Sequence, residues 1–420
     1  MTLRIRLLAS LAFVCFVPGS MVMAQIPERG LGVTDRERPE YDPVGIRVGG
    51  FIMYPSVTSS VTYTDNQFAQ PANEQDDTIF ILAPEILVES QWSRHSLNLS
   101  GGLASSFHDK NDSDDATDYG VGAEGRLDIT RATSLSVSGG YDVTHEDRGD
   151  PDQPATAVEP TQVTEVTAEA ALDQRFNRLS LRPAISFSDV DFEDVALIGG
   201  GTVNNDDRDR QELVASLRGG YEVSPALEVF VEGRYRTIDY DSFDDNLGGG
   251  GVARRDSKGY DALIGASFDV GRVARGEVAV GYTEQDYDSS LIPSIDGFIY
   301  EAGISWFLTE LTTLNLLGTR QTEETTLAGA SGNVTTEGNL RVDHELLRNL
   351  LIGVEGSYAN ETFEGIGRED DNYSAAVDVT YLINRNLRAQ VGYEFESRET
   401  NAIGAEFDQN TVFLVLRAAL

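Results

Sequence analysis

Apolar and polar residues alternate with a period of two along the chain, from about residue 44 to Leu420. The segment that begins at Leu387 shows the pattern plainly. Its apolar positions are Leu387, Ala389, Val391, Tyr393 and Phe395, and they alternate with Arg388, Gln390, Gly392, Glu394 and Glu396. Successive side chains of a β-strand point to opposite faces, so this period indicates strands with one apolar and one polar face. Segments 119–129, 227–236 and 373–381 repeat the pattern, which predicts an all-β protein.

The connections between these segments fall into two classes that follow one another in turn. Short connections, such as Gln91-Trp92-Ser93 and Asn384-Arg385-Asn386, alternate with longer acidic stretches, such as 109–117, 146–159 and 241–256. A soluble sandwich also has alternating strands, but short turns at one end and long loops at the other are typical of an outer-membrane β-barrel. We count about eighteen strands, nine long loops and eight short turns.

The fold that we predict is a transmembrane, antiparallel, up-and-down β-barrel formed by residues 44–420. Closure of the barrel pairs every backbone N–H and C=O, which a segment in lipid requires. Only the outer face must be apolar, and the chain is 40% hydrophobic. An even number of strands places both ends of the barrel on the periplasmic side with the short turns, and the long loops outside the cell.

The first 24 residues form a different kind of segment. Arg4 and Arg6 precede an apolar stretch from Leu7 to Val17, and small or apolar residues lie before a cleavage site after Ala24. This pattern predicts a cleaved signal peptide and therefore export. Cys15, the chain's one cysteine, lies inside it. Residues 25–43 are polar and without a period, so we expect a flexible periplasmic N-terminal segment there.

The charge of the chain excludes one class of partner. Asp and Glu number 69 against 32 Lys and Arg, which gives a net charge of −37. Binding to phosphate backbones needs a basic face, so we expect no nucleic acid. With 4 His and 1 Cys the chain has few ligands for zinc or an iron–sulfur cluster, and we expect no metal and no cofactor.

The inward strand positions are the candidate functional surface. They carry charges of both signs, with acids in excess, and two interpretations stand side by side. The charges either form salt bridges that stiffen the wall, or they contact what passes through the pore. The residues that we expect to line the pore are Glu124, Arg126, Asp128, Arg182, Arg218, Glu228, Glu232, Arg234, Arg236, Glu277, Asp378, Arg388, Glu394 and Glu396.

Catalysis is the alternative that the histidines and acidic loops leave open. On the alternation pattern His108 points inward and His145 outward, so the two do not converge, and no G-x-S-x-G motif is present. The acidic run that begins at Asp109 has Asp114 at its sixth position, where a calcium-binding EF-hand loop needs Gly. We expect no catalytic site, and either solvated loop surface or weak divalent-cation bridging to lipopolysaccharide.

Several short motifs in the first third of the chain carry a family resemblance. Gly49-Gly50-Phe51 leads through Pro55-Ser56 to Tyr63-Thr64-Asp65-Asn66, and Pro84-Glu85-Ile86 precedes Gln91-Trp92-Ser93-Arg94-His95. With these motifs the chain resembles the outer-membrane β-barrel porin family (type 2) of Gram-negative bacteria. Members of that family are associated with exopolysaccharide and capsule export loci. The resemblance implies no catalytic residues.

The function that we expect is therefore a passive conduit in the outer membrane, and the resemblance implies export of a polysaccharide. Two alternatives remain open from the residues: a cation-preferring diffusion porin for small polar solutes, and a structural or adhesive barrel. An outer-membrane hydrolase is the enzyme alternative. The expected partners are outer-membrane lipid and lipopolysaccharide, with periplasmic polysaccharide-export machinery in the export case.

Overall fold

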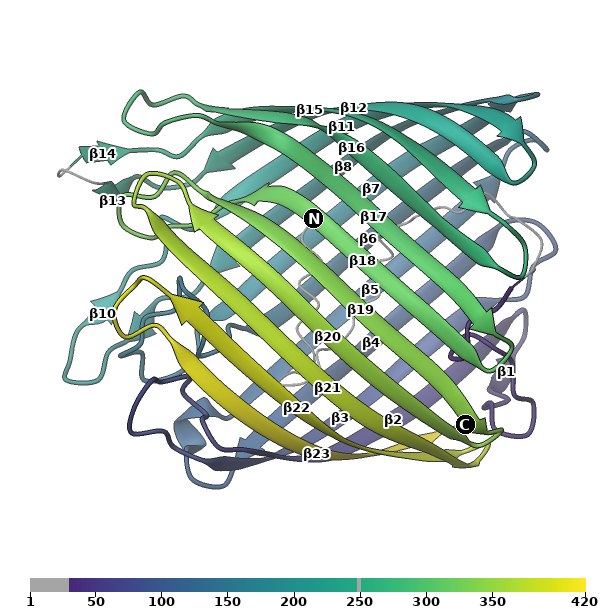
Figure 1. Ribbon diagram of the computed structural model, residues 1–420, viewed down its shortest axis with the longest axis horizontal. Coiled ribbons are helices and arrows are strands. Elements are labelled where there is room, and N and C mark those ends of the chain that lie inside the picture. The colour runs from purple at the N-terminus through teal and green to yellow at the C-terminus, as the bar shows by residue number, and fades with distance from the viewer. Residues whose placement is uncertain (1–29, 248–250) are drawn as a thin grey trace.

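The chain forms a closed antiparallel β-barrel of eighteen strands (Figure 1). The structure is a computed structural model that describes residues 30–247 and 251–420. The predicted signal peptide, residues 1–24, lies outside the described residues. Each barrel strand pairs with its neighbours in chain order, and β23 pairs with β2 to close the ring, with Thr64 opposite Thr411. The predicted fold class and strand number are confirmed.

The barrel strands are 12 to 17 residues long, and one end of the barrel carries most of the irregular chain. Their bounds are β2 Phe51–Thr64, β3 Asp77–Ser90, β4 Ser96–His108, β5 Ala116–Asp128, β6 Thr133–His145, β7 Gln162–Phe176, β8 Leu179–Phe192, β11 Arg210–Ser224, β12 Leu227–Tyr240, β15 Ser257–Asp269, β16 Ala274–Tyr287, β17 Ile295–Thr309, β18 Thr312–Glu323, β19 Asn333–Leu347, β20 Leu350–Phe363, β21 Arg368–Asn384, β22 Leu387–Thr400 and β23 Phe407–Ala419.

Short elements outside the ring decorate the two ends. These are β1 Ile46–Val48, the 3₁₀ turn η1 Asp112–Asp114, β9 Val195–Ala196, β10 Thr202–Val203, β13 Asp244–Leu247 and β14 Gly251–Ala253. All except β1 lie in the long connections, at what we call the loop end of the barrel (left in Figure 1). We call the opposite end, with the short connections, the turn end. Among the described residues, no helix is long and apolar enough to cross a membrane.

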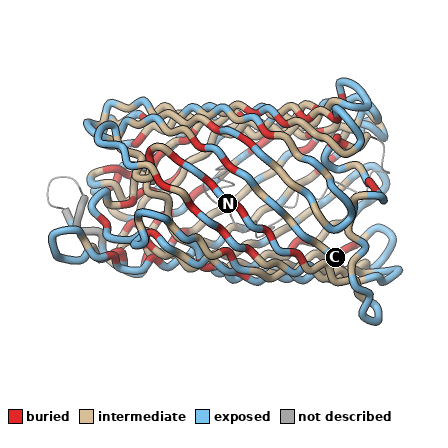
Figure 2. Tube along the Cα trace, turned by 90° about the horizontal axis from the view of Figure 1, so that it is seen from below, coloured by how far each residue is buried: buried red, intermediate tan, exposed pale blue. Residues whose placement is uncertain are grey.

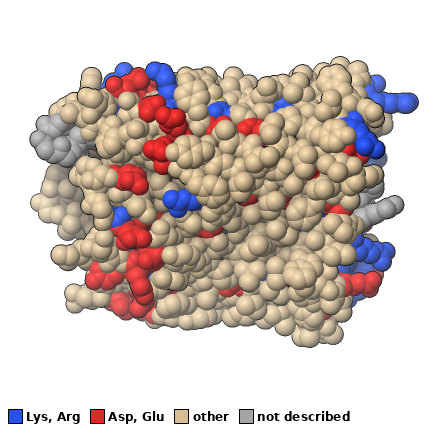
Figure 3. Space-filling model, turned by 45° about the horizontal axis from the view of Figure 1, so that its top comes forward, with Lys and Arg blue, Asp and Glu red and all other residues tan. Residues whose placement is uncertain are grey.

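Alternation of the side chains gives the barrel two chemically different faces. On β22, Val391 and Tyr393 are exposed on the outer face. Glu394, the next residue along the strand, points to the inner face and is buried. Figure 2 shows the same mixture of buried and exposed positions along the strands. On the face shown in Figure 3, charged side chains gather toward the two ends and the middle band is nearly free of them. A band of this kind is what the hydrocarbon core of a bilayer requires.

The inner face is not uniformly polar, which differs from the water-filled polar interior that alternation predicts. Phe230, Leu263, Ala279 and Ile299 form an apolar cluster on neighbouring strands of the inner wall. Phe230 lies two residues from both Glu228 and Glu232 on β12, so its side chain points inward with theirs. Its ring lies over Gly265 of β15, where an added Cβ would collide with it. Phe413 lies over Gly392 in the same way, so glycines on the inner wall make room for aromatic rings.

The segment before the barrel lies along the turn end and joins several strands. The Val33 N–H donates to Thr313 Oγ1 at 2.9 Å, and Arg38 Nη2 lies 2.9 Å from Glu345 Oε2. Further along, Arg385 Nε donates to Pro39 O at 2.7 Å, and β1 pairs with β2. Residues 30–43 are therefore held against the barrel, which differs from the flexible segment predicted for residues 25–43; residues 25–29 lie outside the described residues. The sequence of this segment shows no period because isolated hydrogen bonds and ion pairs hold it to the barrel, and such contacts leave no repeat in the sequence.

Candidate functional site

The fourteen residues expected to line the pore alternate in sequence with residues of the outer face. Arg218 follows Leu217, Glu232 follows Val231 and Asp378 follows Val377, and all three apolar neighbours are exposed. Strand pairing gives the same assignment, because residues directly opposite each other share a face: Arg218 pairs with Arg182 and with Glu232. Their role in permeation is a proposal.

Arg218 connects four neighbouring strands of the inner wall. From β11 its guanidinium reaches over the Phe230 ring of β12, 3.4 Å from the ring centroid, to Ser267 of β15 and Glu277 of β16. Both bonds to Glu277 measure 2.7 Å, from Nη1 to Oε1 and from Nη2 to Oε2. A planar fork of this kind suits Arg and not Lys. The arginine therefore acts as a brace between strands and at the same time covers an apolar ring.

Two more arginines brace the wall in the same manner. Arg234 of β12 contacts Glu232 at 2.7 Å on its own strand and Glu301 of β17 at 2.6 Å. Arg341 of β19 contacts Asp343 at 2.9 Å and Glu355 of β20 at 2.9 Å, and it reaches Asp378 of β21 at 3.0 Å. Arg341 was not among the residues expected to line the pore. The sequence does contain a pattern that predicts its inward position, because Asn339, Arg341 and Asp343 alternate with the apolar Leu340 and Val342.

Smaller ion pairs involve four of the other nine expected residues, Arg126, Asp128, Arg182 and Arg236. Arg126 lies 3.0 Å from Asp128, Arg236 lies 3.0 Å from Glu212, and Arg182 lies 3.8 Å from Glu169. Glu228 accepts a hydrogen bond from Ser180 at 3.2 Å. On neighbouring strands β22 and β23, Arg388 stands opposite Arg417. Wall salt bridges are thus a large part of the inner charge pattern, in accord with the first of the two interpretations.

A cavity of about 310 Å³ lies at the loop end, enclosed by the barrel wall and by the loop between β6 and β7. Its lining is rich in hydroxyl and amide groups and strongly acidic. The acids outnumber the arginines by eight to two. The acids are Asp114, Asp118, Glu146, Asp147, Glu323, Glu337, Glu361 and Glu396, and the arginines are Arg148 and Arg398.

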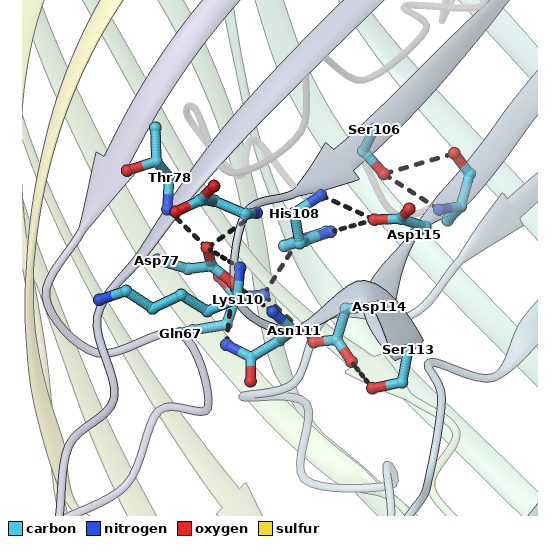
Figure 4. A network of polar contacts seen from close by, with 12 residues as sticks. Gln67, Asp77, Thr78, Ser106, His108, Lys110, Asn111, Ser113, Asp114 and Asp115 are labelled. Atoms are coloured by element: carbon cyan, nitrogen blue, oxygen red, sulfur yellow. Dashed lines mark hydrogen bonds and ion pairs between the residues drawn. The ribbon is translucent and has the colours of Figure 1, made fainter.

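The loop between β4 and β5 is fixed at the rim of this cavity by buried carboxylates (Figure 4). Asp77, at the start of β3, accepts hydrogen bonds from the backbone N–H groups of Thr78, Asp109, Lys110 and Asn111 and from the Asn111 side chain. Asp114 accepts a hydrogen bond from Gln67 at 3.2 Å and pairs with Arg148. Asp114 and Asp115 of the acidic run are therefore occupied by protein donors, which argues against their use for bridging cations.

His108 and His145 both line this cavity, which differs from the outward position that alternation gives to His145, and each of the two contacts a different aspartate. Near the end of β6 the alternation of exposure shifts: Val143 is buried and Thr144 is exposed. His145 consequently comes within 2.7 Å of Asp118, from Nδ1 to Oδ1. His108 Nδ1 lies 3.3 Å from Asp115 Oδ1. Among the described residues, no group of three or more His, Cys, Asp or Glu is arranged to hold a metal ion.

Burial and neighbouring charged groups shift the pKa of two carboxyl groups at the loop end. Burial, together with the negative charges of Asp191, Asp206 and Asp241, raises the pKa of Asp209, just before β11, to about 6, although a hydrogen bond from the Phe192 N–H acts in the opposite direction. The opposite shift occurs where a cation is near: the hydrogen bond from Lys110 lowers the pKa of the exposed Asp76. Asp209 thus titrates near neutral pH at the loop end.

A family model identifies the chain. The model described as "Putative beta-barrel porin 2" matches residues 38–420, which include the whole barrel. The chain belongs to this porin family. It is accordingly an outer-membrane β-barrel porin, and the barrel described above is its membrane-spanning part. The chain matches no curated protein sequence.

Solved porins and receptors of the outer membrane resemble this porin only distantly. OccK3 (OpdO) of Pseudomonas aeruginosa is 15% identical, with 88% of this chain and 96% of that chain covered and a TM-score of 0.45. OccAB2 of Acinetobacter baumannii is 11% identical over 89% and 98% of the chains, with a TM-score of 0.46. A mutant of the ferric enterobactin receptor PfeA of P. aeruginosa is 8% identical over 88% and 80%, with a TM-score of 0.48. The strand number and the closure of the barrel are therefore established by the strand pairing of this porin itself, and not by these similarities.

Proposed function

We propose that this porin is a passive, cation-preferring channel through the outer membrane. The observation that carries the proposal is the cavity at the loop end, where eight carboxylates face two arginines. Barrels of this strand number enclose an aqueous channel. Fixed negative charges along a narrow aqueous path concentrate cations and repel anions. Outer-membrane lipid and lipopolysaccharide would surround such a channel.

The hydroxyl groups of the inner wall favour a second candidate, which is export of a polysaccharide. Ser56, Thr58, Ser60, Thr62 and Thr64 follow one another on the inner face of β2. Hydroxyl groups donate and accept hydrogen bonds, as sugar hydroxyls do, so such a row suits a hydroxylated chain. Because the acidic lining would repel a polyanion, the polymer in this proposal is neutral or weakly charged. Periplasmic polysaccharide-export machinery would be the partner that delivers it.

Reversal potentials in planar bilayers across a salt gradient test the channel. We expect cation preference at about 0.1 M salt that fades toward about 1 M, as the Debye length falls from about 10 Å to about 3 Å. Replacing the cavity-lining Glu323, Glu337 and Glu361 with Gln should weaken the preference, whereas Ile403→Ala in an exposed loop should not. Anion preference at low salt would contradict the proposal. Loss of a cell-surface polysaccharide on deletion of the gene would favour the export candidate.

A further inference from the structure

The loop between β6 and β7, residues 146–161, makes contacts on nearly opposite sides of the barrel mouth. Asp152 Oδ1 accepts hydrogen bonds from Thr325 Oγ1 at 2.8 Å and from the Thr326 N–H at 3.1 Å. Thr325 and Thr326 belong to the loop between β18 and β19. Around the ring, six strands separate β7 from β18 on one side and eight separate β6 from β19 on the other. A loop that joins these two places must cross the mouth.

Further contacts fix the loop to other parts of the rim. The Gly149 carbonyl accepts a hydrogen bond from Arg398 Nη1 of β22 at 2.7 Å. Toward β8, the Val158 N–H donates to Ala196 O and the Ile198 N–H donates to Thr156 O, both at 2.8 Å. At its base, Glu146 is held by Arg208, with Oε2 3.0 Å from Nη1. The loop therefore touches rim segments on at least three sides of the opening.

Internal contacts give the crossing loop a fixed shape of its own. Arg148 lies inside it, where its Nη1 donates to Ala157 O at 2.7 Å and its Nη2 to Val158 O at 3.0 Å. The same guanidinium pairs with Asp114 of the loop between β4 and β5, and only 8% of the Arg148 side chain is exposed. Pro151, Pro154 and Pro160 restrict the backbone further. Arg148 is thus the positioning residue that holds the loop folded and joined to the rim.

We infer that loop 146–161 is the constriction that sets the size limit of this channel at the loop end. The inference rests on the proposed function as a channel and adds the element that selects solutes by size. Residues of the loop, among them Glu146, Asp147 and Arg148, form one side of the 310 Å³ cavity, and the inner wall from β18 through β23 and on to β5 forms the rest. Solutes that enter from the loop end pass between these two surfaces, so the position of the loop determines the free cross-section.

The experiment compares three altered proteins with the full-length porin in planar bilayers and in liposome swelling with neutral sugars of increasing size. In the first, residues 147–160 are replaced by a short Gly/Ser turn, which the pairing of His145 with Gln162 allows. The second is Arg148→Met. The third carries Asp152→Cys and Thr325→Cys, whose side chains already touch. Cys15 is the chain's one cysteine and lies in the predicted signal peptide, so no other thiol competes.

We expect single-channel conductance to rise roughly twofold or more in the loop replacement, and larger sugars to pass. Arg148→Met should shift both readouts in the same direction. The oxidised double-cysteine protein should conduct no better than wild type, and a reductant should raise its conductance to that of Asp152→Cys alone. The control shortens loop 401–406, whose hydrogen bonds run within itself and to the neighbouring β20–β21 hairpin, and should leave both readouts unchanged.

The outcomes separate the constriction from the channel itself. A conducting wild type whose conductance and sugar cut-off stay the same in all folded loop variants would overturn the constriction and leave the channel standing. A silent wild type with a conducting loop replacement would support the constriction. Silence of every variant would overturn the channel and the constriction with it. If the loop replacement does not fold, the redox response of the double-cysteine protein decides alone.

Discussion

Single residues on the inner wall combine packing with charge. Phe230 is held between Gly265, which leaves room for its ring, and Arg218, whose guanidinium covers it. The same arginine joins four strands through Glu277. A cation over an aromatic ring gains from the ring's negative face, and more so where water is partly excluded. One aromatic residue therefore helps to orient an ion pair that spans four strands of the wall.

Gly265→Ala tests this arrangement. The added methyl group would meet the Phe230 ring and the Val278 carbonyl oxygen, and overpacking of this kind costs about 1–3 kcal/mol. We expect a lower urea midpoint for unfolding of the barrel in detergent or lipid. The matched control is Gly233→Ala on β12, where nothing lies within 4 Å of the added carbon. Equal midpoints for the two variants would contradict the packing described here.

Asp209 gives a prediction about pH. Its pKa of about 6 in the folded porin lies above the ordinary value of 3.8, so the folded state holds the proton more firmly than the unfolded chain. Its contribution to stability is complete below about pH 4 and is lost as the pH rises through 6. Asp209→Asn should therefore leave stability near that of wild type at pH 4 and raise it at pH 7. A stability difference between the two proteins that does not change from pH 4 to pH 7 would contradict the shifted pKa.

At the scale of the strand, the period of two divides each element between lipid and interior. Val391 is 50% exposed on the outer face of β22, opposite the exposed Leu414 of β23, whereas Gln390 belongs to the other face. A strand in this position must tolerate quite different substitutions at neighbouring residues. The inner face accepts charge because water or an ion partner is near, and the outer face does not.

Val391→Arg should destabilise the barrel by about 2–4 kcal/mol if the residue lies near the bilayer midplane. Gln390→Arg, one residue away, should cost much less. Folding into lipid vesicles followed by denaturant titration measures both. Comparable losses for the two variants would mean that the assignment of faces on β22 is wrong.

At the scale of the whole molecule, the two ends of the barrel are expected on opposite sides of the membrane. Cysteines at Ile198 and Ile403, which are exposed at the loop end, should react with an impermeant reagent on intact cells. A cysteine at Arg272, in an exposed turn, should react only after the outer membrane is opened. Asp114 and Asn205 lie in long loops but are buried, so they are poor probes. The reverse labelling pattern would contradict the orientation.

The alternation of residues and the two classes of connection were enough to predict the fold of this porin. A strand between lipid and water must show a period of two, and a closed barrel must alternate its connections between two ends. For that reason the eighteen strands, the loop end and the turn end could be derived from local pattern alone. The same pattern identified the positions of Arg218, Glu232 and Glu277, because alternation assigns a face to each residue without knowledge of its contacts.

Contacts between distant parts of the chain were decided only by the tertiary structure. Alternation assigns a face but not a partner, so it could not show that Arg218 reaches Glu277 or that Phe230 lies over Gly265. It also fails where a strand ends, which is why His145 was assigned to the wrong face. The path of loop 146–161 has no period at all. Its contact between Asp152 and Thr325 joins residues 173 positions apart, and closure of the barrel alone brings them together.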